Sequence, residues 1–272
     1  MRFAPLLNHH EGPMPYLDLE DYRIFYNDTG DGPPLILLHN GFYSTETWDG
    51  VRAALAERFR VIDYDRRGYG RSTHLESLPD GDVVDISATE LGQVMDGLSI
   101  ERAHLIGHCL GGAAALVFAA AHPRRVTQLV AASVGYFGSL KSMVAADMTF
   151  VPFAQIPATL RETMRRMHGA EYIETLWELL RKDKRSYIMN ERFDIRKAVK
   201  SVKQPLLMAN GDRDFYFEPA HPLSMFKKMR KTAELWIVPG VGHDIHMEQP
   251  ELFASEVLRF FDRNAGKASA RK

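Results

Sequence analysis

The chain has 272 residues, 45% hydrophobic and 25% charged, with a formal net charge of -1, which is ordinary for one large globular domain. This balance provides no basic surface for nucleic acid or acidic lipid, and no apolar run is long enough for a signal peptide or a membrane span, so we expect a small-molecule substrate as the partner. The single cysteine, Cys109, excludes an internal disulfide and a cysteine-based metal site and fits a cytoplasmic location, whereas the oligomeric state stays open.

The first half of the chain alternates between short apolar runs and segments with helical spacing. Residues 16–26 predict an opening β-hairpin. The strands and helices expected after it are strands at 34–39, 60–65, 103–107 and 126–134 and helices at 48–59, 83–98 and 111–122. This alternation is typical of βαβ units and a parallel sheet.

Between residues 136 and 202 the alternation stops, and the sequence is helical, rich in methionine and basic. Glu171 to Arg181 predicts an amphipathic helix within this segment. The alternation then resumes with strands at 205–209 and 234–238 and helices at 222–229 and 250–262. The simplest interpretation is a doubly wound α/β core, formed by residues 1–135 and 203–272, with a helical lid inserted at 136–202.

The segment Gly107-His-Cys-Leu-Gly111 lies where a buried strand meets a helix, which is the context of a G-x-S-x-G nucleophile elbow. Glycines flank the central residue because strand and helix must approach closely in this strained turn. The amides and the positive dipole end of the helix would favour a thiolate at Cys109. The alternative, a cysteine that only fills space in the core, fits this context less well.

Two later loops at strand ends supply partners for such a nucleophile. Asp214 follows the strand at 205–209, at the carboxyl edge where ligands bind in open α/β sheets, although Asp212 competes for the role and either could cap a turn. His243 follows the strand at 234–238 in a glycine-rich loop that can place an imidazole over the sheet edge. We therefore expect His243 as the base and Asp214 as the acid that orients it.

Other histidines are interpreted as structural. His246 lies three residues after His243, but no cluster of carboxylates or cysteines supports a metal site, so no metal is expected. His168 and His221 are expected at the surface or in loops.

The loop after the first core strand is placed to complete an oxyanion hole. The amide of Gly41 would act beside that of Leu110, because glycine lets the backbone approach a ligand closely. The segment Asp65 to Ser72 has glycines like those of a phosphate loop but lacks its lysine ending, so it predicts a structural turn.

Five motifs together resemble the α/β-hydrolase superfamily, in its branch with a lid, over residues 16–264. They are His39-Asn-Gly-Phe with Trp48 downstream, Asp65 to Ser72, Gly107-His-Cys-Leu-Gly-Gly112, Gly211-Asp-Arg-Asp214 and Pro239-Gly-Val-Gly-His243. The resemblance implies a mostly parallel eight-stranded sheet with helices on both faces, a catalytic triad of Cys109, Asp214 and His243, an oxyanion hole and no cofactor. The chain departs from the family in carrying cysteine for the usual serine and Asn40 for the usual glycine.

A cysteine nucleophile points to acyl transfer through a thioester. Because a thiolate leaves a tetrahedral intermediate more easily than an alkoxide, unactivated amides are less suitable substrates. We expect a hydrolase that acts on a carboxylic ester, lactone or thioester of a small apolar substrate. Three alternatives stay open: an acyltransferase with the same intermediate, a ligand receptor on a hydrolase scaffold with little turnover, and a Ser→Cys variant of a serine hydrolase.

The substrate pocket is expected between the core and the lid, whose methionines and aromatic residues suggest an apolar wall. For most of these lid side chains, packing onto the core is the alternative. The predicted pocket residues are Asn40, Phe42, His108, Phe137 and Trp177.

Overall fold

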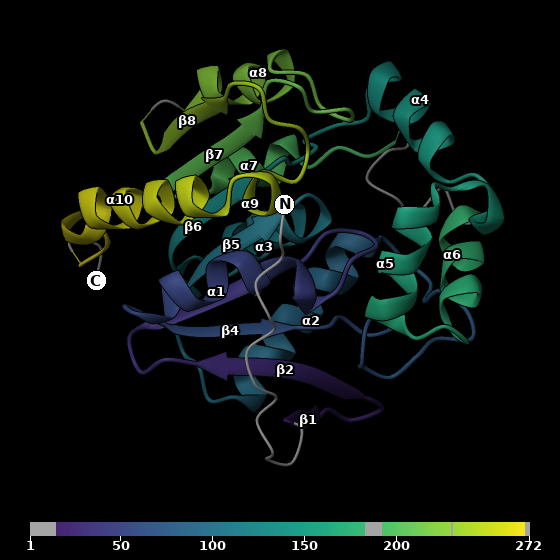
Figure 1. The fold of residues 1–272 in the computed structure, drawn as a ribbon. Helices are drawn as coiled ribbons and strands as arrows, with labels where there is room; N and C mark the ends of the chain where they lie inside the picture. The colour runs from purple at the N-terminus through teal and green to yellow at the C-terminus, as the bar shows by residue number, and fades with distance from the viewer. Residues whose placement is uncertain (1–14, 183–191, 230, 270–272) are drawn as a thin grey trace.

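The computed structural model describes residues 15–182, 192–229 and 231–269, which form a twisted sheet covered by helices (Figure 1). The strands lie in the order β1-β2-β4-β3-β5-β6-β7-β8. Their bounds are Tyr16–Asp18, Arg23–Thr29, Pro34–Leu38, Arg60–Tyr64, Ala103–His108, Val126–Ala132, Leu206–Gly211 and Ala233–Val238 for β1 to β8. β1 and β2 pair antiparallel and β3 to β8 are parallel, which confirms the predicted mostly parallel sheet of eight strands.

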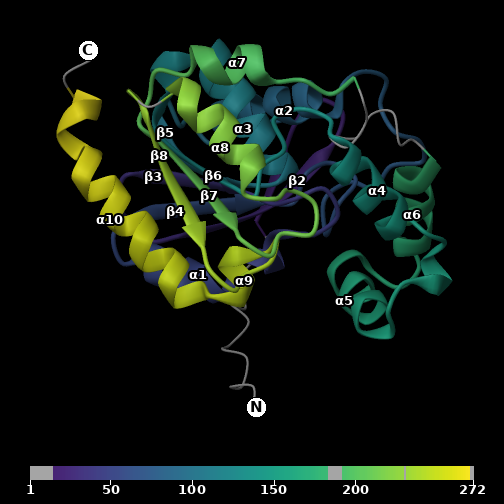
Figure 2. The same cartoon turned by 90° about the horizontal axis from the view of Figure 1, so that it is seen from above.

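Helices cover both faces of this sheet, as Figure 2 shows, with α1, α9 and α10 on one face and α2, α3, α7 and α8 on the other. The helix bounds for α1 to α10 are Asp49–Ala56, Val83–Gly97, Leu110–Ala121, Leu140–Thr149, Ala158–His168, Ile173–Lys182, Arg196–Ser201, Ala220–Met229, Ile245–Glu248 and Pro250–Ser269. None of the helices in the described ranges combines the length and the apolar character needed to cross a membrane.

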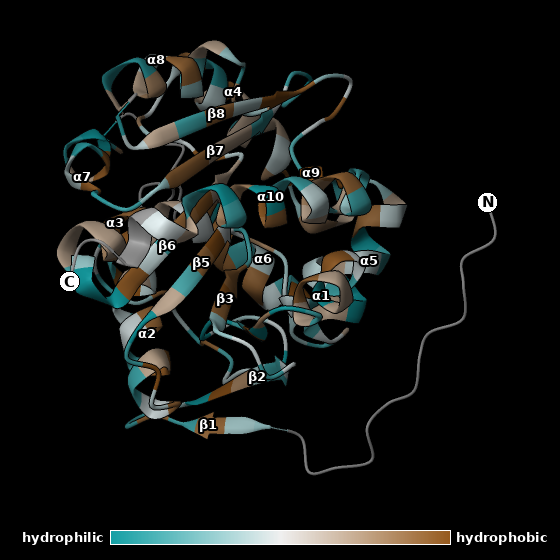
Figure 3. Ribbon diagram, turned by 90° about the vertical axis from the view of Figure 1, so that its left-hand side faces the viewer, coloured by the Kyte–Doolittle hydropathy of each residue, from teal (hydrophilic) through white to brown (hydrophobic). Residues whose placement is uncertain are grey.

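The central strands are apolar on both sides because each face carries its own core. In β3, Leu35 and Leu37 pack into the cluster under α1 and α10, whereas Ile36 and Leu38 pack into the cluster under α2 and α3. Successive side chains of a strand point to opposite faces, so a strand buried on both faces is a continuous apolar run rather than an alternating one. Figure 3 shows this hydrophobic character along β3 and β5.

Helices α4, α5 and α6 are inserted between β6 and β7 and lie to one side of the sheet (Figures 1 and 2). The predicted amphipathic helix within this segment corresponds to α6, which buries Leu176 and Trp177 among other residues. Helix α7, although it also lies within residues 136–202, packs against α3 and α8 of the layered core. The role of this insertion as a lid stays a prediction.

The turn between β5 and α3 is compact because side chains are absent where the backbones meet. A Cβ on Gly111 would lie 2.3 Å from the carbonyl oxygen of Leu38 and 2.5 Å from that of His39. A Cβ on Gly107 would lie 2.5 Å from the backbone of Gly112. These distances are too short for any side chain, so the elbow needs these glycines.

Replacing Gly111 by alanine therefore forces the helix away from β3. We expect Gly111→Ala to lower the free energy of unfolding by about 1–3 kcal/mol or more, as overpacking in a core does. The matched control is Gly266→Ala in α10, where a Cβ meets nothing within 4 Å and a gain of up to ~1 kcal/mol is expected. Urea unfolding of both variants measures the difference, and equal stabilities would contradict the close approach.

Candidate active site

Cys109 occupies a strained backbone position between β5 and α3. Its φ is 51° and its ψ is -112°, values that a residue with a side chain rarely adopts. Its amide donates to the carbonyl oxygen of Ala132 at 2.9 Å, which ties the turn to β6. Cys109 is buried, with 4% of its surface exposed, at the start of α3. Strained residues that a fold maintains tend to lie at functional sites.

His243 and Asp214 meet beside this turn. Nδ1 of His243 lies 3.0 Å from Oδ2 of Asp214. The other carboxylate oxygen, Oδ1, accepts the amides of Tyr216 at 2.8 Å and Phe217 at 2.9 Å. The carboxylate is thus held by the backbone on one side and faces the imidazole on the other, the arrangement that fixes a histidine tautomer.

The competing residue Asp212 has a different position. Its Oδ1 accepts the amide of Gly240 at 2.6 Å, so it caps the loop that leads to His243 rather than contacting the ring. The two loops touch through Gly211, where a Cβ would lie 2.2 Å from the carbonyl oxygen of Val241. The structure therefore brings Asp214, and not Asp212, to His243.

The electrostatics of this cluster favour a charged imidazole. Burial favours the neutral ring, but the carboxylate of Asp214 and the sulfur of Cys109 outweigh burial and raise the pKa of His243 well above its usual value. An imidazolium beside a sulfur stabilises a thiolate. The arrangement is suited to nucleophilic attack by sulfur with proton transfer through the ring.

The loop after β3 is ordered by Asn40. Oδ1 of Asn40 accepts the amides of Phe42 at 3.0 Å and Tyr43 at 2.8 Å, and its carbonyl oxygen accepts from the guanidinium of Arg66. Asn40 is buried and shapes the loop, so its departure from the family pattern has a structural use here. The contact of Gly111 with the end of β3 sets this loop beside the first turn of α3.

The two predicted oxyanion donors lie on these adjacent segments. Gly41 is in the Asn40 loop, and Leu110 is the first residue of α3. Amides in the first turn of a helix have no acceptor within the helix. The placement is compatible with an oxyanion hole, which stays a prediction.

The predicted pocket residues do not all lie together. The rings of Phe42 and Trp177 lie 6.1 Å apart, and Phe150 of the insertion lies 6.3 Å from Phe42, so these residues join the core loop to α6. Phe137 instead stacks on His221 at 4.3 Å, under α8. His108 is fully buried and contacts the backbone of His243, so it lies behind the imidazole.

Tyr216 was not predicted from the sequence, although it contacts His243. Its ring lies 4.7 Å from the imidazole, and its hydroxyl shares a hydrogen bond of 2.6 Å with Thr149 at the end of α4. Lys141 of the same helix donates to the carbonyl oxygen of Asp214 at 3.3 Å. The insertion is therefore tied directly to the loop that carries the acid. The only sequence signal was the position of Tyr216, two residues after Asp214.

Three potential metal ligands lie close together in the described part of the chain. His108, His243 and Asp244 bring one ligand atom each to within 4.8 Å of one another. His246, which follows His243 in the sequence, instead bonds Thr47 through Nε2 at 2.8 Å. The H-x-x-H pair therefore does not point at a common site.

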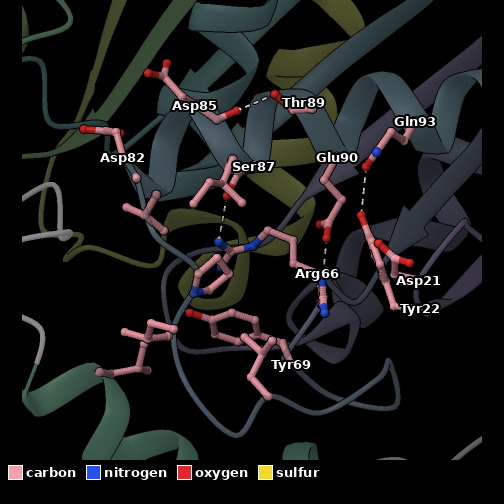
Figure 4. Close-up of a pocket in the computed structure, with 18 residues that line it drawn as sticks. Asp21, Tyr22, Arg66, Tyr69, Asp82, Asp85, Ser87, Thr89, Glu90 and Gln93 are labelled. Atoms are coloured by element: carbon pink, nitrogen blue, oxygen red, sulfur yellow. Dashed lines mark hydrogen bonds between the residues drawn. The ribbon is translucent and has the colours of Figure 1, made fainter.

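A cavity of about 540 Å³ lies between the start of α2 and the preceding loop, next to Leu180 of α6 (Figure 4). Arg66 lines this cavity and donates to Ser87 at 3.3 Å across it. Because Arg66 also bonds the carbonyl oxygen of Asn40, the cavity borders the loop of the candidate oxyanion hole. Cys109 and His243 are not among the described residues that line it.

The expectation that His168 and His221 lie at the surface or in loops is wrong, because they lie in α5 and α8 and are only 2% and 6% exposed. His168, at the end of α5, accepts the amide of Gly70 at Nδ1 and donates from Nε2 to the carbonyl oxygen of Phe42, at 2.8 and 2.9 Å. Both bonds are possible at once only for the neutral ring. Burial, the main cause, lowers the pKa of His168 to about 4.

Because this pKa is below the value of 6.5 for a free histidine, the unfolded state binds more protons as the pH falls. The stability that the neutral ring contributes is complete above pH ~6.5 and is lost towards pH ~4. Glutamine can accept and donate in the same way without titrating. We expect the free energy of unfolding of His168→Gln, measured in urea, to change less with pH across this window, because about one fewer proton is bound on unfolding. If the free energy of unfolding of this variant depended on pH as that of the wild type does, the neutral bridge would be contradicted.

Comparison with known proteins identifies the family of this fold. The model of the alpha/beta hydrolase family matches residues 35–256. A putative carbamate hydrolase, RutD, of Caulobacter sp. strain K31 is 28% identical over 88% of this chain and 96% of its own length. A 2-hydroxy-6-oxo-6-phenylhexa-2,4-dienoate hydrolase of Burkholderia cepacia is 25% identical over 89% and 92%.

Among solved structures, a meta-cleavage product hydrolase of Pseudomonas fluorescens IP01 superposes with a TM-score of 0.75, at 20% identity over 92% of this chain and 97% of that one. This likeness supports the fold. The match to the family model covers most of the chain, including all the strand ends described above. The chain therefore belongs to the alpha/beta hydrolase family and is an enzyme of the hydrolase type.

Proposed function

We propose that this enzyme hydrolyses a carboxylic ester, lactone or thioester of a small apolar substrate, with Cys109 as nucleophile, His243 as base and Asp214 as the orienting acid. The observation that carries the proposal is the position of Cys109 at a positive φ, at a helix N-terminus, beside an imidazole that bonds a buried carboxylate.

In the proposed first half-reaction, Nε2 of His243 holds the thiol proton as an imidazolium beside the thiolate, and the sulfur adds to the substrate carbonyl. The tetrahedral intermediate then collapses to a thioester on Cys109, and the imidazolium gives its proton to the departing alcohol or thiol. In the second half, His243 takes a proton from water, the hydroxide attacks the thioester, and the acid leaves as the thiol is restored. Asp214 keeps the ring in the required orientation throughout.

The amides of Gly41 and Leu110 are proposed to stabilise the oxyanion of both tetrahedral intermediates. Loss of one such donor typically costs ~2.7–4 kcal/mol of transition-state stabilisation. Asn40 supports this function because its side chain fixes the turn from Phe42 to Tyr43 that follows Gly41.

The substrate class follows from the sulfur and from the surrounding side chains. Thiolate is a better leaving group than alkoxide, so the intermediate advances readily only when the substrate itself carries a good leaving group. The rings of Phe42, Phe150 and Trp177 pack together where the inserted helices, which we propose as the lid, meet the core, so this junction is apolar. The named relatives act on a carbamate and on a dienoate, according to their names, and both names describe hydrolysis of small organic molecules.

The first test is the reactivity of the sulfur. We expect iodoacetamide to alkylate Cys109 about tenfold faster at pH 7 than a free thiol, which is only a few per cent ionised there. His243→Ala and Asp214→Asn should both slow the reaction, because each removes part of the charge pattern that stabilises the thiolate.

Asp212→Asn is the matched control, since Asp212 contacts Gly240 instead of the ring. Its alkylation rate should equal that of the wild type. A rate unchanged in His243→Ala would refute the thiolate–imidazolium pair.

The second test identifies the acyl group. The enzyme is incubated with a panel of carboxylic esters, lactones and acyl thioesters, and its intact mass is measured. We expect a mass gain that disappears in Cys109→Ala, together with release of the free acid. Transfer to an added alcohol or thiol in place of water would identify an acyltransferase, and no adduct or turnover with any member would favour a receptor.

A further inference from the structure

Backbone strain marks a second residue beside the candidate base. In the described chain, three residues other than glycine have a positive φ: Ser99, Cys109 and Ser133. Ser99 follows the end of α2, but Ser133 lies at the carboxyl end of β6, fully buried, with a φ of 50°. Its hydroxyl donates to the backbone carbonyl oxygen of His243 at 2.7 Å. Strain of this kind persists only where the surrounding structure enforces it.

His108 contacts the same carbonyl oxygen. Its Nε2 lies 3.0 Å from the oxygen of His243, so both lone pairs of that carbonyl are used. Because a carbonyl only accepts, Nε2 of His108 must carry the proton. Burial, followed by the neighbouring rings of His246 and His243, lowers the pKa of His108 well below its usual value, which keeps this donor neutral.

Packing holds the His108 ring in place. It lies between the ring of His243, at 4.8 Å, and the ring of His246, at 4.6 Å. The ring of His246 in turn lies 4.3 Å from that of Trp48, and His246 bonds Thr47. The donor at Nε2 therefore lies in a buried cluster of rings from three separate segments.

The backbone anchor acts on the residue between two held segments of the loop, because Asp212 accepts the amide of Gly240 and Glu248 accepts those of Gly242 and Asp244. His243 follows Gly240, which has a φ of 75°, and Gly242. The titratable groups that face the imidazole are Asp214, Cys109, Tyr216, His108 and Asp244. Asp214 fixes only Nδ1, so the position of the main chain decides where the opposite nitrogen points.

We propose that His108 and Ser133 are positioning residues, which hold the backbone carbonyl of His243 and thereby direct its ring at Cys109 and Asp214. This inference rests on the proposed role of His243 as the base. It assigns to His108 a function different from the substrate contact expected from the sequence.

The test measures the protonation of His243 by NMR titration of its imidazole. His108→Phe keeps a ring of similar size without the donor, and Ser133→Gly removes the hydroxyl at a position whose φ suits glycine. We expect each substitution to lower the proton affinity of His243 by about two- to tenfold, as for the loss of one hydrogen bond, and the double variant to lower it by more than either single one. Ser133→Gly should fold at least as stably as the wild type.

His246→Phe is the matched control, because it alters the same cluster of rings and removes no bond to His243. This variant should be less stable to heat than the wild type, and the proton affinity of its His243 should be unchanged. The positioning role would be overturned if the proton affinity of His243 were unchanged in the double variant. It would also be overturned if His246→Phe lowered that affinity as much as the double variant does.

A parallel measurement separates this inference from the proposed function. The pH profile of Cys109 alkylation should move in the double variant in the direction set by His243→Ala. If wild-type alkylation does not depend on His243, the proposed function fails, and the NMR titration still decides whether His108 and Ser133 hold the imidazole.

Discussion

The approach of β5 to α3 is the constraint on which the candidate site depends. Gly107 and Gly112 bring the two backbones so close that a Cβ on Gly107 would overlap the next segment. Cys109, which connects the strand to the helix, adopts a positive φ in this tight turn. The main chain thus determines where the sulfur lies, and the other groups of the site must be brought to it.

Two further strand ends bring those groups. β7 and β8 are neighbours in the sheet, and their loops make contact because Gly211 has no side chain. Asp214 and His243 therefore meet over an edge that the parallel arrangement already shares. β6, which lies between β5 and β7, supplies Ser133 to the carbonyl of His243, so four consecutive strands contribute to one cluster.

The sequence was sufficient for the architecture because the relevant signals are local. The apolar run at 34–39 and the glycine pattern around Cys109 each specify a strand or a turn without reference to distant residues. The same reasoning placed Asp214 correctly relative to the strand end, but it could separate Asp214 from Asp212 only by preference. Their tertiary contacts distinguish them, because Asp214 contacts His243 and Asp212 contacts Gly240.

The histidines show why the remainder could not be predicted. His168 bonds Gly70 and Phe42, which lie about a hundred residues away in the chain. No periodicity encodes such a pairing, since it depends on how the inserted helices dock on the core. A buried histidine and an exposed one look alike in a sequence, and the expectation for His168 failed for that reason.

Burial also explains how one histidine differs chemically from the others. It lowers the pKa of His246 to about 3 and that of His168 to about 4, so these rings act as neutral hydrogen-bonding groups. His243 experiences the same desolvation, but Asp214 and Cys109 reverse its effect. Because the interior tolerates charge only where a countercharge is fixed beside it, the backbone amides that hold Asp214 also support the basicity of His243. Tyr216 bonds Thr149 of α4, and His168 of α5 bonds Phe42 of the core, so these neutral contacts join the inserted helices to the core without adding a further buried charge.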